Sequence, residues 1–229
     1  MKLNKLEFMF WGISVIMLVI SFLWSKSNLL YLFASIVGVT ALIYLAKGEP
    51  RGQVLTILFS VLYGVISYKY RYYGEMMTYL GMTLPSALIA ATIWYRHPFE
   101  KGKTVVKVSI LSKKHILSLV LLTPIVAYVM YRLLAYLKTS ELILSTVSVV
   151  TSFMASMLTI YRSKYYALFY AFNDIVLIAL WILASMHDPS FLPMVLCFVI
   201  FLANDLYALF KWKILSDTQN RQKEVPLSR

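Results

Sequence analysis

Two copies of an amide–acid pair stand among apolar residues in the last third of the chain. Asn173-Asp174 and Asn204-Asp205 both fall inside long hydrophobic stretches. An ionised carboxylate at the centre of a lipid bilayer costs at least about 3 kcal/mol, so such groups turn inward and take partners. Either the pairs line a polar pocket, or they join helices through hydrogen bonds worth about 1 kcal/mol each. We favour the pocket for the first pair, and both interpretations stay open for the second, which lies nearer a helix end.

Aromatic residues accompany the first pair at helical spacing. Tyr170 precedes Asp174 by four residues and Trp181 follows it by seven, so all three share one face of a helix. A flat heteroaromatic ring would stack on these aromatics while sugar hydroxyls bond to the amide and the carboxylate. Packing is the commoner role of a lone aromatic residue in a membrane helix, but the acid beside this stripe favours binding. Tyr63, at helical spacing with two serines in an earlier stretch, is a further candidate.

The sequence gives no sign of catalysis. Its three histidines, His97, His115 and His187, fall in expected loops or helix ends, and no His/Cys spacing suits a metal. Only eight glycines are present, and they form no phosphate-binding loop. We therefore expect no catalytic residues, no metal and no cofactor, which argues against an enzyme.

Composition places the chain in a lipid bilayer. Of its 229 residues 60% are hydrophobic and 14% charged, whereas soluble domains are about 45–50% apolar and about 25% charged. The net charge of +12 is better explained by the Lys and Arg of cytoplasmic loops than by nucleic-acid binding. No small-residue cleavage site follows the first apolar stretch, so we expect it to stay as a helix.

Eight stretches approach the length of about 20 apolar residues that crosses a bilayer. Backbone groups in hydrocarbon must be satisfied within a helix or a closed barrel, and continuous apolar runs favour helices. The expected helices are Phe8–Trp24, Asn28–Ala46, Gln53–Tyr68, Met76–Tyr95, Ile116–Tyr136, Leu142–Tyr161, Tyr165–Met186 and Phe191–Phe210. With a cytoplasmic N-terminus, 17 of the 22 basic residues fall inside and 5 outside, so we expect both termini in the cytoplasm.

The longest loop, from Arg96 to His115, is basic and divides the chain. After one extra N-terminal helix, three helices precede the loop, and three more follow one further helix behind it. This predicts two triple-helix bundles running in the same direction. Internal repeats of this kind are common in transporters, which hold their substrate between them. The expected segments are an extra helix (1–27), a first bundle (28–96), a basic loop with a linker helix (97–138), a second bundle (139–213) and a cytoplasmic tail (214–229).

Several short motifs resemble those of one transporter family in their order and spacing. They are Tyr63-Gly64, Tyr73-Gly74-Glu75-Met76-Met77, Asp174 before an apolar run, and Asn204-Asp205-Leu206-Tyr207 followed by Trp212. Together they resemble the PnuC family, which transports nicotinamide riboside and related vitamin or nucleoside precursors. The resemblance extends from about Trp11 to Trp212.

The resemblance implies an all-α, 3+1+3 fold like that of the SWEET sugar transporters, here with one extra N-terminal helix. It also implies facilitated uptake of nicotinamide riboside through the bacterial inner membrane for NAD synthesis. A cytoplasmic kinase would trap the imported nucleoside, and the transporter itself would need no ATP site. Family members resemble trimers, so a homotrimer is expected.

One departure from the family leaves the cargo open. Nicotinamide riboside transporters carry a Trp-x-x-Trp pair at the start of the penultimate helix, where this sequence has Ala167 and Tyr170. The change predicts a roomier and less flat-walled pocket. A deoxynucleoside, thiamine or riboflavin is therefore an alternative cargo, and a membrane sensor or enzyme without flux is a less favoured one.

Overall fold

The computed structural model describes residues 4–25, 29–69, 73–100, 102–139, 141–187 and 192–224. Within these ranges eight helices are long and apolar enough to cross a membrane, which confirms the expected all-α membrane architecture. The expected helix ends Asn28 and Phe191 lie outside the described residues. The elements are α1 (Lys5–Ser25), α2 (Leu29–Ala46), α3 (Pro50–Lys69), α4 (Tyr73–Met76), the π-helix η1 (Met77–Thr83), α5 (Leu84–Arg96), α6 (Lys113–Tyr136), α7 (Leu142–Ile160), α8 (Tyr166–His187) and α9 (Leu192–Glu224).

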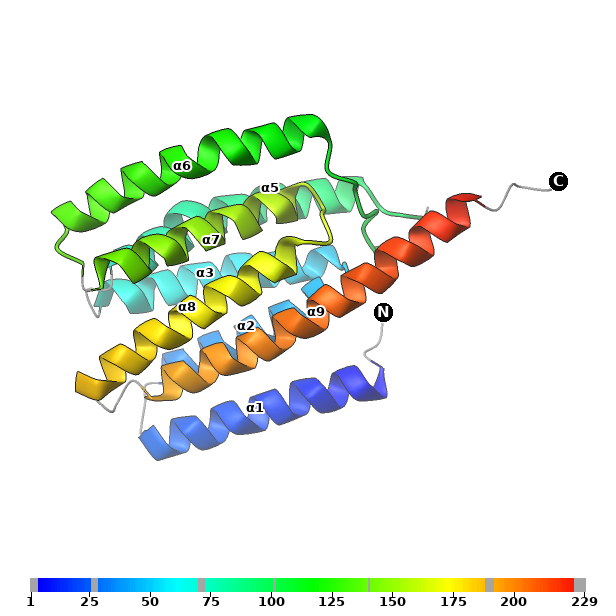
Figure 1. Cartoon of the computed structure of the whole chain (residues 1–229). Coiled ribbons are helices and arrows are strands. Elements are labelled where there is room, and N and C mark those ends of the chain that lie inside the picture. The colour runs from blue at the N-terminus through cyan, green and yellow to red at the C-terminus, as the bar shows by residue number, and fades with distance from the viewer. Residues whose placement is uncertain are drawn as a thin grey trace.

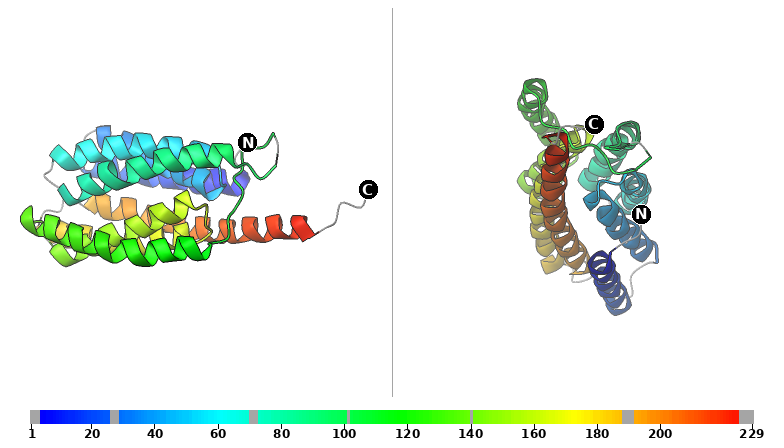
Figure 2. Two further views of the ribbon diagram at one scale, coloured as in Figure 1. Left: turned by 90° about the horizontal axis from the view of Figure 1, so that it is seen from above. Right: turned by 90° about the vertical axis from the view of Figure 1, so that its right-hand side faces the viewer.

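The long helices form two groups that stand side by side (Figures 1 and 2). One group contains α2, α3 and the fourth span, α4–η1–α5, and the other contains α7, α8 and α9. The first helix of each group packs against the last helix of the other, α2 against α9 and α5 against α7. This reciprocal packing is expected when the two groups are related by an approximate two-fold axis parallel to the helices. Transporters with parallel repeats have such an axis. Linker helix α6 packs on α7, and α1 packs on α2 and α9.

The turns between the first and second helices of the two bundles have the same backbone pattern. Gly48 donates to the Leu45 carbonyl at 2.9 Å, and Arg162 donates to the Thr159 carbonyl at 3.0 Å. Both turn residues are left-handed, with φ of 69° at Gly48 and 56° at Arg162. This conformation closes a helix end and reverses the chain. The equivalence supports the parallel repeats expected from the loop pattern.

The fourth span is not the single α-helix expected over Met76–Tyr95. Its middle is the π-helix η1, in which Leu84 donates to the Tyr79 carbonyl five residues back. Pro85 has no N–H to donate to the preceding turn, which is a recognised cause of such irregular turns. The π-helix also presses on α3, because a Cβ placed on Gly64 would lie 2.4 Å from the Leu80 Cγ. Close packing against Leu80 therefore explains why the Tyr63-Gly64 motif has a glycine at its second position.

Helix α9 continues to Glu224, past Phe210, where we expected the span to end, and past the expected tail boundary at 214. The added turns contain no Gly or Pro, and they project beyond the other helices (Figure 1). One side chain of this extension, Gln219, is only 2% exposed. The extension is therefore a packed part of the fold rather than a free tail.

A buried ion pair holds the extra helix α1 in place. Glu7 lies 2.6 Å from the Lys47 ammonium, and both side chains are 4% exposed. The Lys211 ammonium lies 3.7 Å from the same carboxylate, so α1 is joined to both α2 and α9. Further along α1, the Trp11 indole donates to the Thr40 hydroxyl at 3.0 Å.

Residues 97–100 and 102–111, here called the strap, cross one end of the molecule between α5 and α6. The strap folds back on itself through a short antiparallel bridge between Pro98 and Val106. Both described chain ends lie at this strap end (Figure 1). Its last residue leads into α6 through a capping box in which Ser112 and His115 satisfy each other's backbone N–H groups.

Candidate functional site

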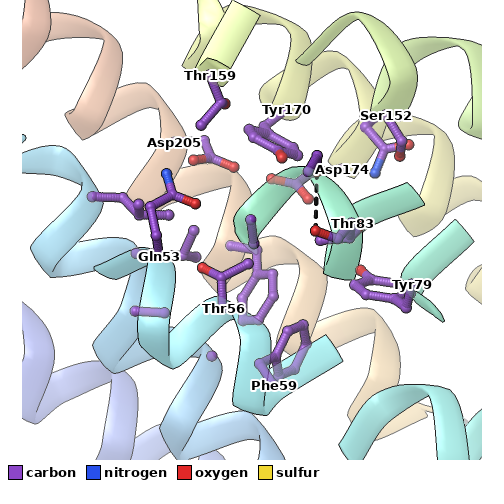
Figure 3. A pocket seen from close by; sticks show the side chains of 18 residues that line it. Gln53, Thr56, Phe59, Tyr79, Thr83, Ser152, Thr159, Tyr170, Asp174 and Asp205 are labelled. Atoms are coloured by element: carbon purple, nitrogen blue, oxygen red, sulfur yellow. Dashed lines mark hydrogen bonds between the residues drawn. The ribbon is translucent and has the colours of Figure 1, made fainter. Parts of the chain in front are cut away.

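A cavity of about 60 Å³ lies between the two bundles and is lined by both polar and apolar side chains (Figure 3). Polar side chains from six helical elements reach it. They are Gln53, Thr56, Tyr79, Thr83, Ser86, Ser152, Thr159, Tyr170, Asn173, Asp174 and Asp205. The apolar part of the wall includes Gly38, Ala41, Leu42, Leu45, Phe59, Ala87 and Phe201. Typical ligand pockets hold roughly 300–1,000 Å³, so a nucleoside-sized molecule requires these walls to move apart.

Two carboxyl groups dominate the chemistry of the cavity. Asp174 on α8 and Asp205 on α9 are 4% and 3% exposed, and both side chains line the same cavity. Thr83 lies beside Asp174 in Figure 3, and its hydroxyl donates to the Thr78 carbonyl at 3.2 Å. The lining includes no Lys, Arg or His side chain. The cavity therefore offers acceptors to a positive or hydroxyl-rich ligand and no charged donor to an anion.

Asn173 both joins two helices and reaches the cavity. Its amide oxygen accepts hydrogen bonds from Ser148 at 3.0 Å and from Thr151 at 3.0 Å, both on α7. The same side chain lines the cavity on α8. The two roles that the sequence set against each other thus occur together.

The wall opposite the acids carries a donor that the sequence analysis missed. Gln53 is 2% exposed, and its amide nitrogen has no hydrogen-bond partner among the described residues. A buried amide N–H without a partner is costly, so this nitrogen is well suited to a ligand acceptor. Gln53 stands at the polar edge of its apolar stretch, where such residues usually face the membrane surface, and no spacing signal marked it.

The structure brings together four of the seven residues that the sequence proposed for a binding site. Tyr170, Asn173, Asp174 and Asp205 line the cavity. Tyr63, Trp181 and Asn204 are buried outside its lining. The amide nitrogen of Asn204 donates to the Ile200 carbonyl of its own helix at 2.8 Å. Ala167, at the position of the expected Trp pair, is fully buried and also lies outside the lining.

An aromatic cluster closes the cavity toward the strap. Trp94, Tyr166 and Trp212, here called the strap-side cluster, are at most 1% exposed. The rings of Trp94 and Trp212 are 5.3 Å apart, and Tyr166 meets Trp212 edge to face at 4.8 Å. Trp94 and Trp212 come from the last helices of the two bundles, so the cluster spans the boundary between them.

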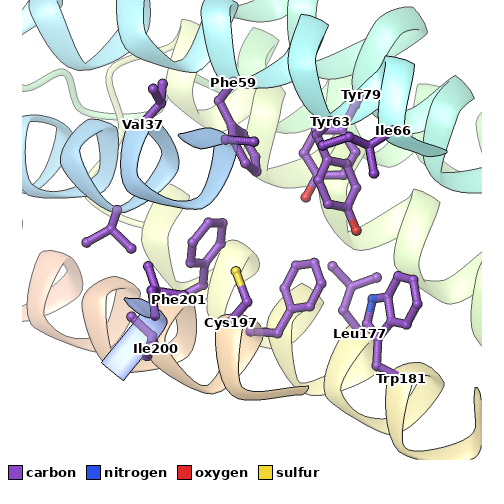
Figure 4. Packing of buried hydrophobic residues seen from close by; sticks show 14 residues of the cluster. Val37, Phe59, Tyr63, Ile66, Tyr79, Leu177, Trp181, Cys197, Ile200 and Phe201 are labelled. Carbon is purple, nitrogen blue, oxygen red and sulfur yellow. The ribbon is translucent and has the colours of Figure 1, made fainter. Parts of the chain in front are cut away.

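A second aromatic cluster packs between the two bundles (Figure 4), and its residues Phe59, Tyr79 and Phe201 line another part of the cavity. It consists of Phe59, Tyr63, Tyr79, Phe198 and Phe201, here called the far-side cluster. The Tyr63 and Tyr79 rings are 4.4 Å apart, and Phe59 meets Phe201 of the other bundle at 5.7 Å. Trp181 packs in the same hydrophobic core, which explains why it does not reach the cavity.

A polar cavity between two bundles of membrane-spanning helices, closed by aromatic clusters on both sides, is the architecture of a membrane transporter. The sequence model of the family described as nicotinamide mononucleotide transporter matches residues 28–214. The chain belongs to this family, which confirms the resemblance seen in the motifs. Helix α1 and the end of α9 lie outside the matched residues.

Named relatives agree with this assignment. The chain is 26% identical over 209 residues to the nicotinamide riboside transporter PnuC of Neisseria mucosa, covering 89% of this chain and 78% of the relative. A crystal structure of the vitamin B3 transporter PnuC is similar in fold, with a TM-score of 0.82 and 23% identity. That similarity covers 95% of this chain and 94% of the solved one.

Proposed function

We propose that this transporter carries nicotinamide riboside by facilitated diffusion. The observation that supports the cargo is the acidic cavity, which contains Asp174 and Asp205 and no basic side chain in its lining. Nicotinamide riboside is a nucleoside whose pyridinium ring carries a positive charge. Its ring would lie near the carboxyl groups, and its ribose hydroxyls and amide would bond to the acceptors and to the free amide nitrogen of Gln53.

The same cavity argues against the mononucleotide in the family's description. A phosphate adds negative charge, which proteins usually meet with Arg, Lys or backbone N–H groups at a helix N-terminus. Beside two acids in a medium of low dielectric, that charge would be repelled. Thiamine, which also has a positive heteroaromatic ring, is the alternative cargo that this charge pattern favours.

The mode of transport follows from the arrangement of the bundles. Movement of one bundle against the other would expose the cavity first to one side and then to the other. We expect the strap end to be cytoplasmic because of the bias of basic residues, and the membrane to be the bacterial inner membrane. A cytoplasmic kinase would keep the gradient inward by modifying the arriving nucleoside. The homotrimer stays a prediction from the resemblance.

Uptake into proteoliposomes tests this proposal. Labelled nicotinamide riboside should equilibrate without ATP and without an ion gradient, and unlabelled riboside should compete at least tenfold better than the mononucleotide. Thiamine and deoxynucleosides in the same competition test the alternatives. Accumulation above the outside concentration that collapses with an uncoupler would contradict facilitated diffusion, and equal competition by the mononucleotide would contradict the assigned cargo.

Asp205→Asn tests the role of the acidic pair. Hydrogen bonds to charged groups contribute about 1.5–3 kcal/mol, so the substitution should weaken riboside binding by roughly tenfold to a hundredfold. Asp217→Asn, at an exposed acid on the same helix, is the matched control and should leave affinity unchanged. Equal affinity of both purified variants in a binding titration would remove Asp205 from the site.

A further inference from the structure

The strap-side cluster is clasped by two hydrogen bonds that cross between the bundles. The Trp94 indole of the first bundle donates to the Thr159 carbonyl of the second at 3.0 Å. The Trp212 indole of the second bundle donates to the Leu45 carbonyl of the first at 2.8 Å. Leu45 and Thr159 both line the cavity. Separating the bundles at this end would therefore break both bonds and uncover the cavity.

The strap ties together the same two bundles from outside. The Val106 N–H donates to the Gly48 carbonyl at 2.9 Å, and the Ser109 N–H donates to the Arg162 carbonyl at 3.0 Å. Gly48 and Arg162 are the equivalent left-handed turn residues of the first and second bundles. Only two residues, Lys107 and Val108, separate the two bonded positions of the strap, so the turns cannot move far apart while both bonds hold.

Gln219 fixes the strap to α9. Its amide oxygen accepts from the Val108 N–H at 2.8 Å, and its amide nitrogen donates to the Val106 carbonyl at 3.0 Å. The Gln219 amide thus pairs with backbone N–H and carbonyl groups of the strap, as a neighbouring β-strand would. Gln219 is 2% exposed, so little water is available to replace these bonds. It lies beyond residue 214, where the match to the family ends.

One face of α9 carries the site, the cluster and the strap anchor. Asp205, Trp212 and Gln219 follow one another at intervals of seven residues, which is two helical turns. An unbroken helix rises about 1.5 Å per residue, so the three side chains span about 21 Å of a single rigid element. Any movement of α9 that displaces Asp205 also pulls on Trp212 and Gln219.

We infer that the strap and Gln219 form a latch that holds the strap-side cluster closed and must release before substrate passes that end. Gln219 is a positioning residue that controls which side of the transporter is open, and it does not touch the substrate. The inference rests on the transporter class and is independent of the cargo. It predicts that weakening the latch favours the state open at the strap end.

Cysteine labelling of the purified full-length protein tests the latch. The reporter is Ala208→Cys in a Cys197→Ala background, because Ala208 is 1% exposed and lies on α9 between Asp205 and Trp212. Adding Gln219→Ala should raise its rate of maleimide labelling by roughly fivefold to thirtyfold, the effect of losing two hydrogen bonds. Gln222→Ala, an exposed glutamine on the same helix, is the matched control and should not change the rate.

Native Cys197, buried in the core beside the far-side cluster, separates opening from general loosening. Its labelling in Gln219→Ala should stay at the wild-type rate or slow. Equal acceleration at both reporters, or no acceleration at position 208, would overturn the inference. If Gln219→Ala does not fold, Gln219→Glu decides: it keeps the acceptor for Val108 and loses the donor to Val106. It should give an intermediate rate, and a wild-type rate would likewise overturn the latch.

Discussion

The two aromatic clusters close opposite sides of one cavity by different physics. In the strap-side cluster, both indole N–H groups bond to backbone carbonyls of the other bundle. In the far-side cluster, rings of the two bundles meet by packing, as Phe59 meets Phe201 at 5.7 Å and Tyr63 meets Phe198 at 6.4 Å. The burial of apolar rings is mostly non-directional and tolerates small shifts, whereas a buried hydrogen bond is either made or left unpaired at a cost. The far-side cluster thus closes through packing of apolar rings, and the strap-side cluster closes through specific hydrogen bonds.

The largest expected effect is at Trp212. Trp212→Ala should destabilise the folded protein by about 3–5 kcal/mol, because it removes a fully buried ring and leaves a cavity. Trp212→Phe keeps a ring but leaves the Leu45 carbonyl unpaired, and should account for about 1–2 kcal/mol of that loss. Unfolding in detergent, followed for both variants, measures the difference. Wild-type stability of Trp212→Phe would mean that the crossing bond contributes nothing.

A smaller effect is expected where α3 meets η1, beside the far-side cluster. Gly64→Ala places a methyl group 2.4 Å from the Leu80 Cγ and should cost about 1–3 kcal/mol through overpacking. Leu80→Ala in the same chain should restore part of this stability, because it removes the clashing atoms. A double-mutant cycle measures the coupling. Additive losses would show that the two residues do not press on one another.

The smallest expected change in stability concerns the tyrosines, because each cluster contains a buried tyrosine hydroxyl without a partner among the described residues. The hydroxyl groups of Tyr63 and Tyr166 have no hydrogen-bond partner among the described residues. Tyr63→Phe and Tyr166→Phe should therefore leave stability unchanged or raise it by about 1 kcal/mol. Thermal unfolding of the two variants measures this. A lower affinity of Tyr63→Phe for substrate would instead support the contact with substrate that the sequence first suggested for this residue.

The helices were predictable because a run of apolar residues is a local property of the sequence. Asp174 and Asp205 were predictable for a similar reason, since an acid inside such a run needs an explanation. The prediction that residues on one helical face would all line the cavity was less successful. Trp181 lies on the expected face of α8 yet packs in the far-side core, because a buried helix has neighbours on several sides.

Other parts of the site and its surroundings left no mark in the sequence. Gln53 looked like a residue of the membrane surface. Pro85 marked an irregular turn in the fourth span, but not that the π-helix would bring Tyr79 and Thr83 to the cavity. The end of α9 is polar, so the apolar pattern stopped at Phe210 although the helix did not. The role of Gln219 could be recognised only from the structure, which places its amide against the strap backbone.

The strap also determines where this transporter tolerates mutation. Its bonds to Gly48 and Arg162 use only backbone atoms of Val106 and Ser109, so of the possible replacements at these two positions only proline removes a donor directly. Exposed positions of the strap are therefore expected to vary while the tether is kept, whereas Val106 is fully buried. The bonds to α9, in contrast, depend on a single amide side chain. The attachment of the strap to α9 is thus expected to be more sensitive to substitution of Gln219 than to substitution of exposed strap residues.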